Sequence, residues 1–373
     1  MRSFDEIFED KTKCGTKIKT SEYKEIGKYA IIDQGQEEIA GYTDLEKGVF
    51  EDVPAIIFGD HTRVIKYVRD PFFLGADGVK ILKCKELNVN YKYLYYALKN
   101  AKIPNTGYNR HFKWLKQIQI EYPSIDKQEK IVKILDKVVM VIEDRRKEIQ
   151  ELDKLIKARF VEMFGDMYLN SKGWSETKLE SMADVVSGIT KGRKTKGEDL
   201  IEVPYMAVSN VKDGYIDWTT IKTIEATQNE IAQYRLLPND VLMTEGGDPD
   251  KVGRGAIIKE PLENCIHQNH IFRVRVDESV IFPEFFAEYL QHQRSKRYFL
   301  GCAKQTTGIA SINMKQLRAL PVLVPSLPEQ KEFVLFKEQV DKSKIVYQAD
   351  PNKLTFLQKI CYNNYKEQYH IPD

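Results

Sequence analysis

"YPSIDKQEKI", residues 122–131, is followed 202 positions later by "VPSLPEQKEF", residues 324–333. At the same offset Leu115 matches Leu317 and Gln128 matches Gln330. Each copy runs from a glycine turn through a short basic segment and a strand-like stretch to a Pro-Ser helix start, with Ser124 or Ser326 as the expected N-cap. Internal repeats of this kind indicate duplicated architecture. The sequence therefore predicts two similar halves, each leading into a helix.

The helix after the first copy has hydrophobic residues at alternating steps of three and four over about five heptads, which is typical of a helix packed against another helix. Its charges are balanced, so it resembles a spacer of about 55 Å more than a DNA-binding helix. We expect it to pair antiparallel with a second helix over 326–365, which Asp350-Pro351 interrupts. The seam has eleven positions, of which eight are apolar: Gln128, Ile131, Leu135, Val138, Ile142, Arg145, Ile149, Leu152, Ile156, Arg159 and Met163.

The segments 20–122 and 174–324 alternate short apolar runs with Gly, Asp and Pro, a pattern that predicts strands joined by turns. Helices are expected at Tyr91–Asn100 and Pro283–Leu300. The predicted fold class is α/β, with two α/β domains separated by two long helices that pair as an antiparallel coiled coil. The predicted domains are a first α/β domain (1–123), a first helical region (124–165), a second α/β domain (166–325) and a second helical region (326–373), interrupted at Pro351.

Composition limits the cellular setting and the partner. No apolar run approaches the roughly 18 residues of a membrane span, and the charged N-terminus has no signal-peptide core. Five scattered cysteines without a CxxC pair favour a reduced, cytoplasmic protein. The net charge is only +2, yet residues 80–116 hold nine Lys or Arg and one acid. Basic clusters recur in both halves, which favours a polyanion as partner, although a solvated surface is the alternative for any single cluster.

The candidate DNA contacts are basic and histidine side chains in polar loops beside these clusters, where each residue alone could equally be a solvated surface group. They are His61, Arg63, Arg110 and Lys113 in the first half, and Lys191, Arg193, Lys194, Lys196, Arg254 and Lys304 in the second half.

The sequence does not predict catalytic chemistry. Asp70-Pro71-Phe72-Phe73 departs from the [DN]PP[YF] loop of amino-group methyltransferases, and no GxxxxGK[ST] phosphate loop occurs. Cys265, His267 and His270 are metal-ligand residue types, but strand alternation would place the two histidines on opposite faces. We therefore predict no catalytic, cofactor-binding or metal-binding residue in this chain.

The whole pattern resembles the specificity subunit of type I restriction-modification enzymes. The resemblance is carried by GYTDLEKG, PAIIFGDHTR, FFLGADGVKIL and TGYNRHFKWLKQIQI in the first half. In the second half it is carried by GWSETKLESMADVVSGIT, VPYMAVSNVKDG, DVLMTEGGDPDKVGRGAII and QTTGIASINMKQL, together with both Pro-Ser helix starts. It covers nearly the whole chain from about residue 20.

The resemblance implies a non-catalytic reader of double-stranded DNA, in which two target-recognition domains bind the halves of a split site. It also implies that the helices dock two methyltransferase subunits and that restriction or translocase subunits join them. S-adenosylmethionine, ATP and Mg²⁺ would then belong to the partner subunits and not to this chain. The alternatives are a DNA adenine methyltransferase fusion or a stand-alone DNA-binding regulator.

Overall fold

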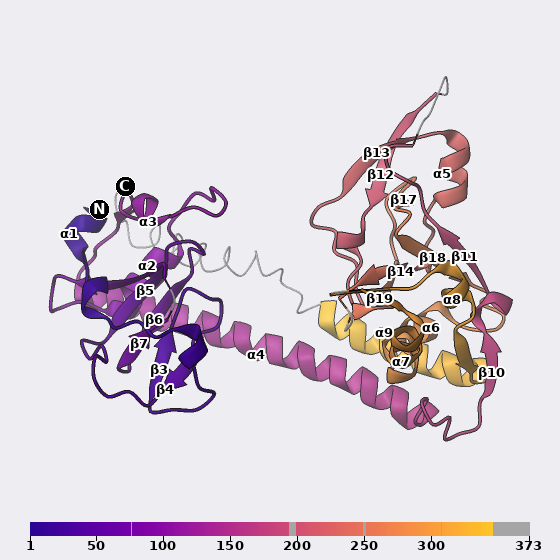
Figure 1. Ribbon diagram of the computed structural model, residues 1–373, viewed down its shortest axis with the longest axis horizontal. Helices are drawn as coiled ribbons and strands as arrows, with labels where there is room; N and C mark the ends of the chain where they lie inside the picture. Colours follow the sequence, from indigo (N-terminus) through magenta and orange to yellow (C-terminus); the bar gives the residue numbers. More distant parts are fainter. Residues whose placement is uncertain (76, 194–198, 249–250, 307, 346–373) are drawn as a thin grey trace. The chain divides into compact units, whose positions relative to one another are not determined.

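The structure is a computed structural model that describes residues 1–75, 77–193, 199–248, 251–306 and 308–345 (Figure 1). The chain divides into unit 1, which includes Met1–Lys147, and unit 2, which lies within Glu148–Tyr347. Helix α4 (Ile125–Phe164) contributes its first part to unit 1 and its last part to unit 2. The predicted long helix is therefore confirmed. In the part of the chain that the structure describes, no helix is both long and apolar enough to cross a membrane.

Unit 1 is built from small sheets with a helix on one of them. A four-stranded antiparallel sheet has the order β2 (Phe8–Asp10), β8 (Val79–Cys84), β5 (Ala55–Gly59), β6 (Ile65–Val68). In a second sheet, β3 (Tyr29–Ile32) lies between antiparallel β4 (Gly41–Thr43) and parallel β7 (Phe72–Leu74). Strand β1 (Arg2–Ser3) pairs with β9 (Gln119–Ile120). The helices are α1 (Phe4–Ile7), α2 (Tyr91–Lys99), which packs on β5 and β6, and α3 (Phe112–Leu115).

Unit 2 repeats these three sheets with the same order and directions. The four-stranded sheet runs β11 (Ala183–Ser187), β18 (Ile271–Val276), β14 (Val241–Thr244), β16 (Gly255–Ile257). Strand β12 (Ile201–Met206) lies between antiparallel β13 (Lys222–Ala226) and parallel β17 (Ile266–His267), and β10 (Ser175–Lys178) pairs with β21 (Pro321–Val324). The duplication seen in a short stretch of sequence thus extends over the whole topology of both units.

Unit 2 also has elements without a counterpart in unit 1. A small sheet has the order β15 (Gly246–Gly247), β20 (Ile309–Ser311), β19 (Lys304–Thr306). The helices of the whole unit are α5 (Gln228–Tyr234), α6 (Pro283–Gln291), α7 (Gln293–Cys302), α8 (Met314–Arg318) and α9 (Leu327–Ile345). Of these, α6, α8 and α9 hold the places of α2, α3 and the start of α4 in unit 1. The single helix expected over Pro283–Leu300 is therefore wrong. His292 adopts extended backbone with ψ of 152° and accepts a hydrogen bond from the Arg294 amide, so it ends one helix and caps the next.

The central strand of each four-stranded sheet separates two cores. Because side chains alternate along a strand, Ile56 and Phe58 of β5 pack in the core beneath α2, and Ile57 packs with Phe72 of β7. In β14, Val241 and Leu242 divide in the same way between two cores. Burial on both faces explains why these strands are apolar runs without alternation in the sequence.

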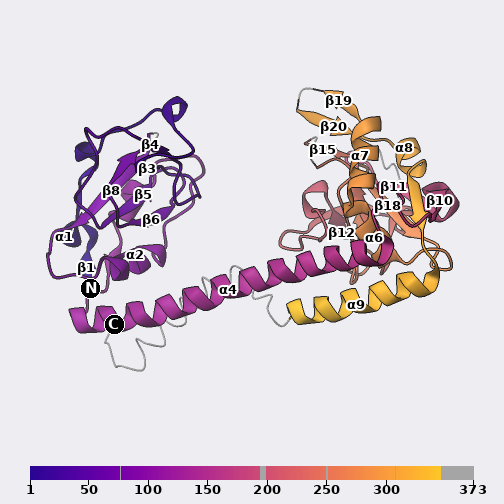
Figure 2. The ribbon, with the colours of Figure 1, turned by 90° about the horizontal axis from the view of Figure 1, so that it is seen from below.

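Within unit 2, α9 pairs antiparallel with the last part of α4 (Figure 2). The Phe333 ring lies 5.2 Å from the Phe160 ring and 5.7 Å from the Phe164 ring, centroid to centroid. Further along α9, Lys344 forms an ion pair with Asp153 at 2.7 Å. Partners of higher number in α9 thus have lower numbers in α4, which confirms the predicted direction. The remainder of the predicted helix 326–365, with its interruption at Pro351, lies outside the described residues.

The repeated glutamine of the two Pro-Ser segments is buried, with 1% of Gln128 and none of Gln330 exposed. Gln128 Oε1 accepts a hydrogen bond from the Asn90 amide at 3.0 Å, and its Nε2 donates to the Pro123 carbonyl at 2.9 Å. Gln330 does the same with the Phe282 amide at 2.9 Å and the Pro325 carbonyl at 2.8 Å.

Asn90 and Phe282 are the N-cap residues of α2 and α6. Each glutamine therefore ties the start of a long helix to the start of the helix that covers the sheet of the same unit. Ser326 completes the second helix start, because its amide and hydroxyl both donate to the Glu329 carboxylate.

Replacement of this glutamine is expected to destabilise the fold. Gln330→Ala leaves the Phe282 amide and the Pro325 carbonyl without their partner, which costs about 1–3 kcal/mol per buried polar group. The matched control is Gln339→Ala, at an exposed position of the same helix. Urea denaturation of the two variants should show a lower midpoint for Gln330→Ala alone. Equal midpoints would contradict the role given to the buried amide.

Candidate nucleic-acid interface

Four loops meet at one edge of unit 1, at the ends of the central strands. They follow β3 (Gln34), join β5 to β6 (60–63), precede β8 (77–78) and join α2 to α3 (105–111). The Asp60 amide donates to the Gly78 carbonyl at 2.7 Å, and the Asp60 carbonyl accepts from the His111 amide at 2.8 Å. Gln34 bonds the His61 amide and the Asp77 carbonyl through its side chain. Backbone and amide hydrogen bonds therefore hold all four loops together.

The structure brings His61 and Arg63 onto one of these loops and Arg110 onto another. The His61 ring stacks on the Tyr108 ring, with centroids 4.8 Å apart and planes 11° from parallel. Arg63, whose φ is 62°, donates to the Ile103 carbonyl at 3.3 Å and lines a cavity of about 400 Å³. Arg110 is exposed. Lys113 lies outside the loops, exposed on α3, with its ammonium 5.2 Å from the Trp114 ring.

Sequence reasoning missed Tyr108, which is 87% exposed at the tip of the loop that carries Arg110. Its position between a glycine and an asparagine in a polar turn was the available signal, because an aromatic side chain in such a turn has little chance of burial.

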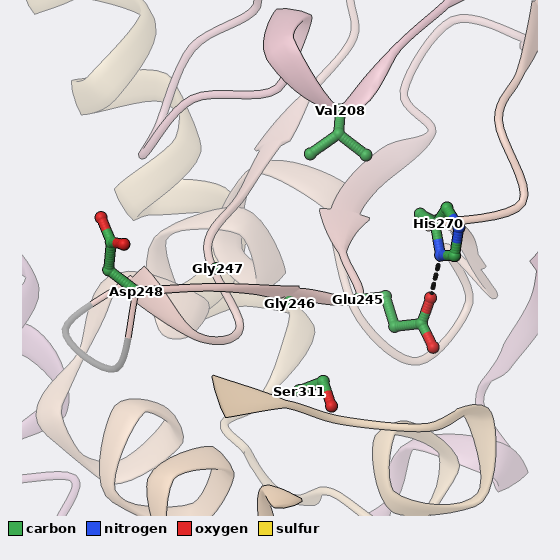
Figure 3. A pocket seen from close by; sticks show the side chains of 7 residues that line it. All are labelled: Val208, Glu245, Gly246, Gly247, Asp248, His270 and Ser311. Carbon is green, nitrogen blue, oxygen red and sulfur yellow. Dashed lines mark hydrogen bonds and ion pairs between the residues drawn. The ribbon is translucent and has the colours of Figure 1, made fainter. Parts of the chain in front are cut away.

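Unit 2 assembles the corresponding loops with the same backbone bonds. The Glu245 amide donates to the His270 carbonyl at 3.0 Å, and the Glu245 carbonyl accepts from the Ile312 amide at 2.8 Å. These loops surround a cavity of about 540 Å³ (Figure 3), in which the Glu245 carboxylate faces the His270 ring, with 2.5 Å between Oε2 and Nδ1. The lining residues are Val208, Glu245, Gly246, Gly247, Asp248, His270 and Ser311.

Three predicted basic residues of unit 2 lie beside this cavity. Lys304, which is exposed, stands opposite Ser311 in the β19–β20 pair. The Arg254 carbonyl accepts from the amide of Thr244, the residue before Glu245. Lys191 is exposed two residues after Ile189, whose carbonyl accepts from the Asn269 amide. The structure thus places Lys191, Arg254 and Lys304 near one loop edge. The sequence alone did not show that these three residues lie close together.

Arg193 is placed differently. Its guanidinium binds both carboxylate oxygens of Glu230 in α5 and the Glu225 carbonyl. The guanidinium lowers the pKa of the Glu230 carboxyl to about 2. Arg193 therefore anchors its loop to α5. Lys194 and Lys196 lie outside the described residues.

The residues considered for metal binding or catalysis have structural roles. His267 is fully buried with Nδ1 3.0 Å from the Tyr234 carbonyl, and this burial lowers its pKa to about 4. Burial also raises the pKa of the Cys265 thiol to about 12. His270 follows β17 and pairs with Glu245 instead. Among the residues that the structure describes, no three His, Cys, Asp or Glu side chains form a metal-binding group. Phe72 and Phe73 lie fully buried in β7.

The structure thus holds a duplicated α/β domain with exposed basic side chains near the loop edge of each copy. The family model described as "Type I restriction modification DNA specificity domain" matches residues 1–154 and 171–355. The chain belongs to this family, which confirms the resemblance seen in the sequence.

Similar curated proteins have the same description. The chain is 27% identical over 169 residues to a putative type I restriction enzyme MjaX specificity subunit of Methanocaldococcus jannaschii, covering 45% of this chain and 39% of the relative. It is 23% identical over 236 residues to the type I restriction enzyme EcoKI specificity subunit of Escherichia coli K12, covering 60% and 50%. The chain thus spans half or less of the length of these relatives.

A solved structure shares the fold. The crystal structure of a type I restriction-modification system S subunit from M. genitalium superposes with a TM-score of 0.54 at 18% identity and covers 96% of this chain and 94% of its own. The predicted α/β fold class with its long helices is confirmed by this likeness.

The Arg193–Glu230 pair predicts a defined pH dependence. The folded-state pKa of Glu230, about 2, lies below its ordinary value of 4.5, so the pair stabilises the fold above pH 4.5 and loses this contribution as the pH falls toward 2. Arg193→Gln should therefore be less stable than the parent at pH 6, with a difference that shrinks toward pH 2. Lys178→Gln, a substitution of an exposed lysine in the same unit, is the control for loss of charge. Parallel stability profiles of parent and Arg193→Gln from pH 6 to 2 would contradict the assignment.

Proposed function

We propose that this chain is the sequence-reading, non-catalytic subunit of a type I restriction-modification complex, and that each unit binds one half of a bipartite double-stranded DNA target. The observation that carries this proposal is the duplicated loop edge. The same backbone bonds fix Asp60 in unit 1 and Glu245 in unit 2, and basic side chains stand beside both. The two units share a backbone scaffold with the same hydrogen bonds but carry different side chains on it. Such a pair suits two DNA half-sites of different sequence.

The side chains of the two edges divide into two physical classes. Exposed bases such as Arg110, Lys191 and Lys304 suit phosphate contacts, which supply affinity and position without reading sequence. Groups nearer the loop centres, such as His61 and Tyr108 in unit 1 or Glu245 and His270 in unit 2, present hydrogen-bonding and aromatic surfaces suited to base edges. Within the predicted set, this arrangement supports His61, Arg63, Arg110, Lys191, Arg254 and Lys304. Lys113 lies outside the loops, Arg193 anchors its loop to α5, and Lys194 and Lys196 lie outside the described residues.

In this proposal, the partner subunits carry out the catalytic steps. Two methyltransferase subunits would dock on α4 and α9 and supply S-adenosylmethionine chemistry, and restriction subunits would supply the ATP- and Mg²⁺-dependent steps in the cytoplasm. The division into target-recognition domains (1–123 and 166–325) and helical spacers (124–165 and 326–373) follows the same proposal. Against a methyltransferase fusion stands the burial of Phe72 and Phe73, because a catalytic loop of that motif must reach its substrate.

Methyl transfer discriminates these possibilities directly. The purified chain, mixed with S-adenosylmethionine and DNA, is expected to transfer no methyl groups, and activity should appear when the methyltransferase subunits are added. Methylation by the chain alone would favour the fusion. Specific DNA binding combined with failure to bind any methyltransferase subunit would favour the stand-alone regulator.

Removal of the three basic side chains near the unit 2 cavity should change the salt dependence of DNA binding. A triple variant with Lys191, Arg254 and Lys304 changed to Gln should lower the slope of log K against log salt by about 2–3, since each phosphate contact contributes roughly 0.9. The matched control changes Lys178, Lys222 and Lys331, which are exposed elsewhere in unit 2, to Gln. Fluorescence anisotropy of the assembled complex measures both. Equal slopes in the two triple variants would remove this edge from the interface.

The long helix is expected to set the spacing between half-sites. We expect the two half-sites to lie about one DNA turn apart, roughly 34 Å or 10 bp, and α4 to measure this distance. Insertion of four residues after Glu148, about one helical turn, should lengthen the spacer and leave both half-sites unchanged. Methylome sequencing of a host that carries the variant reads the motif. Altered half-site bases with a fixed spacer would show that the helix does not measure the DNA.

A further inference from the structure

Asp60 and Glu245 occupy the same place in the two units. Each follows the last residue of a central strand, β5 or β14. The amide of each donates to the carbonyl of the residue directly before a strand, Gly78 before β8 or His270 before β18. The carbonyl of each accepts from the segment that starts α3 or α8. The duplication therefore provides an internal comparison for the function of a carboxylate at this position.

In unit 1 the carboxylate is structural. Asp60 is only 4% exposed, and its Oδ1 accepts a hydrogen bond from the Phe112 amide at the start of α3 at 2.7 Å. Unit 2 meets the same need without a carboxylate from the strand end. Asn313 Oδ1 accepts from the Gln316 amide at 2.9 Å, and Gln316 Oε1 accepts from the Asn313 amide at 2.8 Å, so α8 caps itself. The Glu245 side chain therefore does not cap α8, whereas Asp60 caps α3.

The Glu245 carboxylate lines the cavity shown in Figure 3. Its Oε2 is hydrogen-bonded to His270 Nδ1, which fixes the carboxylate in one orientation. Among the described residues no donor forms a hydrogen bond to Oε1, and the side chain is 35% exposed. Next to it stand Gly246 and Gly247, and a Cβ added at Gly247 would meet only Lys251 Cβ, at 3.8 Å. Gly246 and Gly247 themselves place no side chain in the cavity beside the carboxylate.

A carboxylate on a DNA-binding edge can bind only a few of the groups that DNA presents. A carboxylate repels phosphate and only accepts hydrogen bonds. In the major groove, cytosine N4 and adenine N6 are amino donors, whereas guanine O6 and N7 and thymine O4 are acceptors. A carboxylate oriented by His270 can therefore select between these two classes of base.

We propose that Glu245 is a specificity-determining residue, which accepts a hydrogen bond from the exocyclic amino group of a cytosine or adenine in the half-site bound by unit 2. His270 is its positioning residue. This inference rests on the proposed function and deepens it, because it assigns a base class to one side chain of the site.

The test uses the full complex with its methyltransferase subunits. The methylome of a host carrying the parent complex gives the motif, and competition binding then compares oligonucleotides with each base at every half-site position. Glu245→Ala should reduce discrimination about 10- to 100-fold at one amino-bearing position of one half-site. Glu245→Gln adds an amide donor, so it should tolerate guanine or thymine at that position. The other half-site and the spacer should not change.

The matched control is Glu263→Gln, an exposed carboxylate in the same unit away from the four loops. It should leave the motif and its discrimination unchanged. His270→Gln can still donate to Glu245 and should retain more of the discrimination than His270→Ala, a pattern that a purely structural histidine would not give.

The other outcomes contradict either the proposed function or the role of Glu245. A parent complex without a bipartite motif refutes the proposed function itself. A parent motif that both Glu245 variants keep at full discrimination refutes only the role of Glu245, as does relaxation spread over both half-sites instead of one position. Loss of folding in both variants, measured by thermal unfolding, would make Glu245 structural like Asp60 and would also overturn the inference.

Discussion

The buried side-chain amides of Gln128 and Gln330 connect the sheet and loops of each unit to the long helix that follows them. Each amide joins the first turn of a long helix to the N-cap of the helix that covers a sheet. That covering helix packs against the central strands, and the candidate reading loops leave from the ends of those strands. A buried polar group must keep its partners, so the direction of the helix and the position of the loops are fixed together within each unit. This explains why the same glutamine recurs 202 residues apart.

Much of the fold could be predicted because its signals are local. The heptad spacing of α4, the Pro-Ser helix starts and the apolar central strands all depend on neighbouring residues. The break at His292 could not be predicted, because no glycine or proline lies between Glu284 and Leu300 to mark it. The loop edges were equally inaccessible, since Glu245, His270 and Ser311 are brought together only by the pairing of strands distant in sequence. Arg193 shows the converse error, in which an exposed-looking base is bound by a distant Glu230.

Under the proposed function, affinity for DNA and selectivity between bases would use separate groups of the second unit. Lysine and arginine stand on the rim, where flexible contacts with phosphate suffice and salt screens them. The Glu245–His270 pair stands inside the cavity, where a fixed acceptor can discriminate between base edges.

The most direct measurement is hydrogen exchange of the full complex with and without its methylated target duplex, followed by mass spectrometry. Two homologous loop edges that bind two half-sites predict protection in the peptides around residues 60–63 and 105–111 and, equally, around 245–248 and 308–312. Exchange in β10 and β21 should not change. Protection confined to one unit, or protection that spares these loops in both units, would contradict the central claim that each copy of the duplicated domain reads DNA through the same four loops.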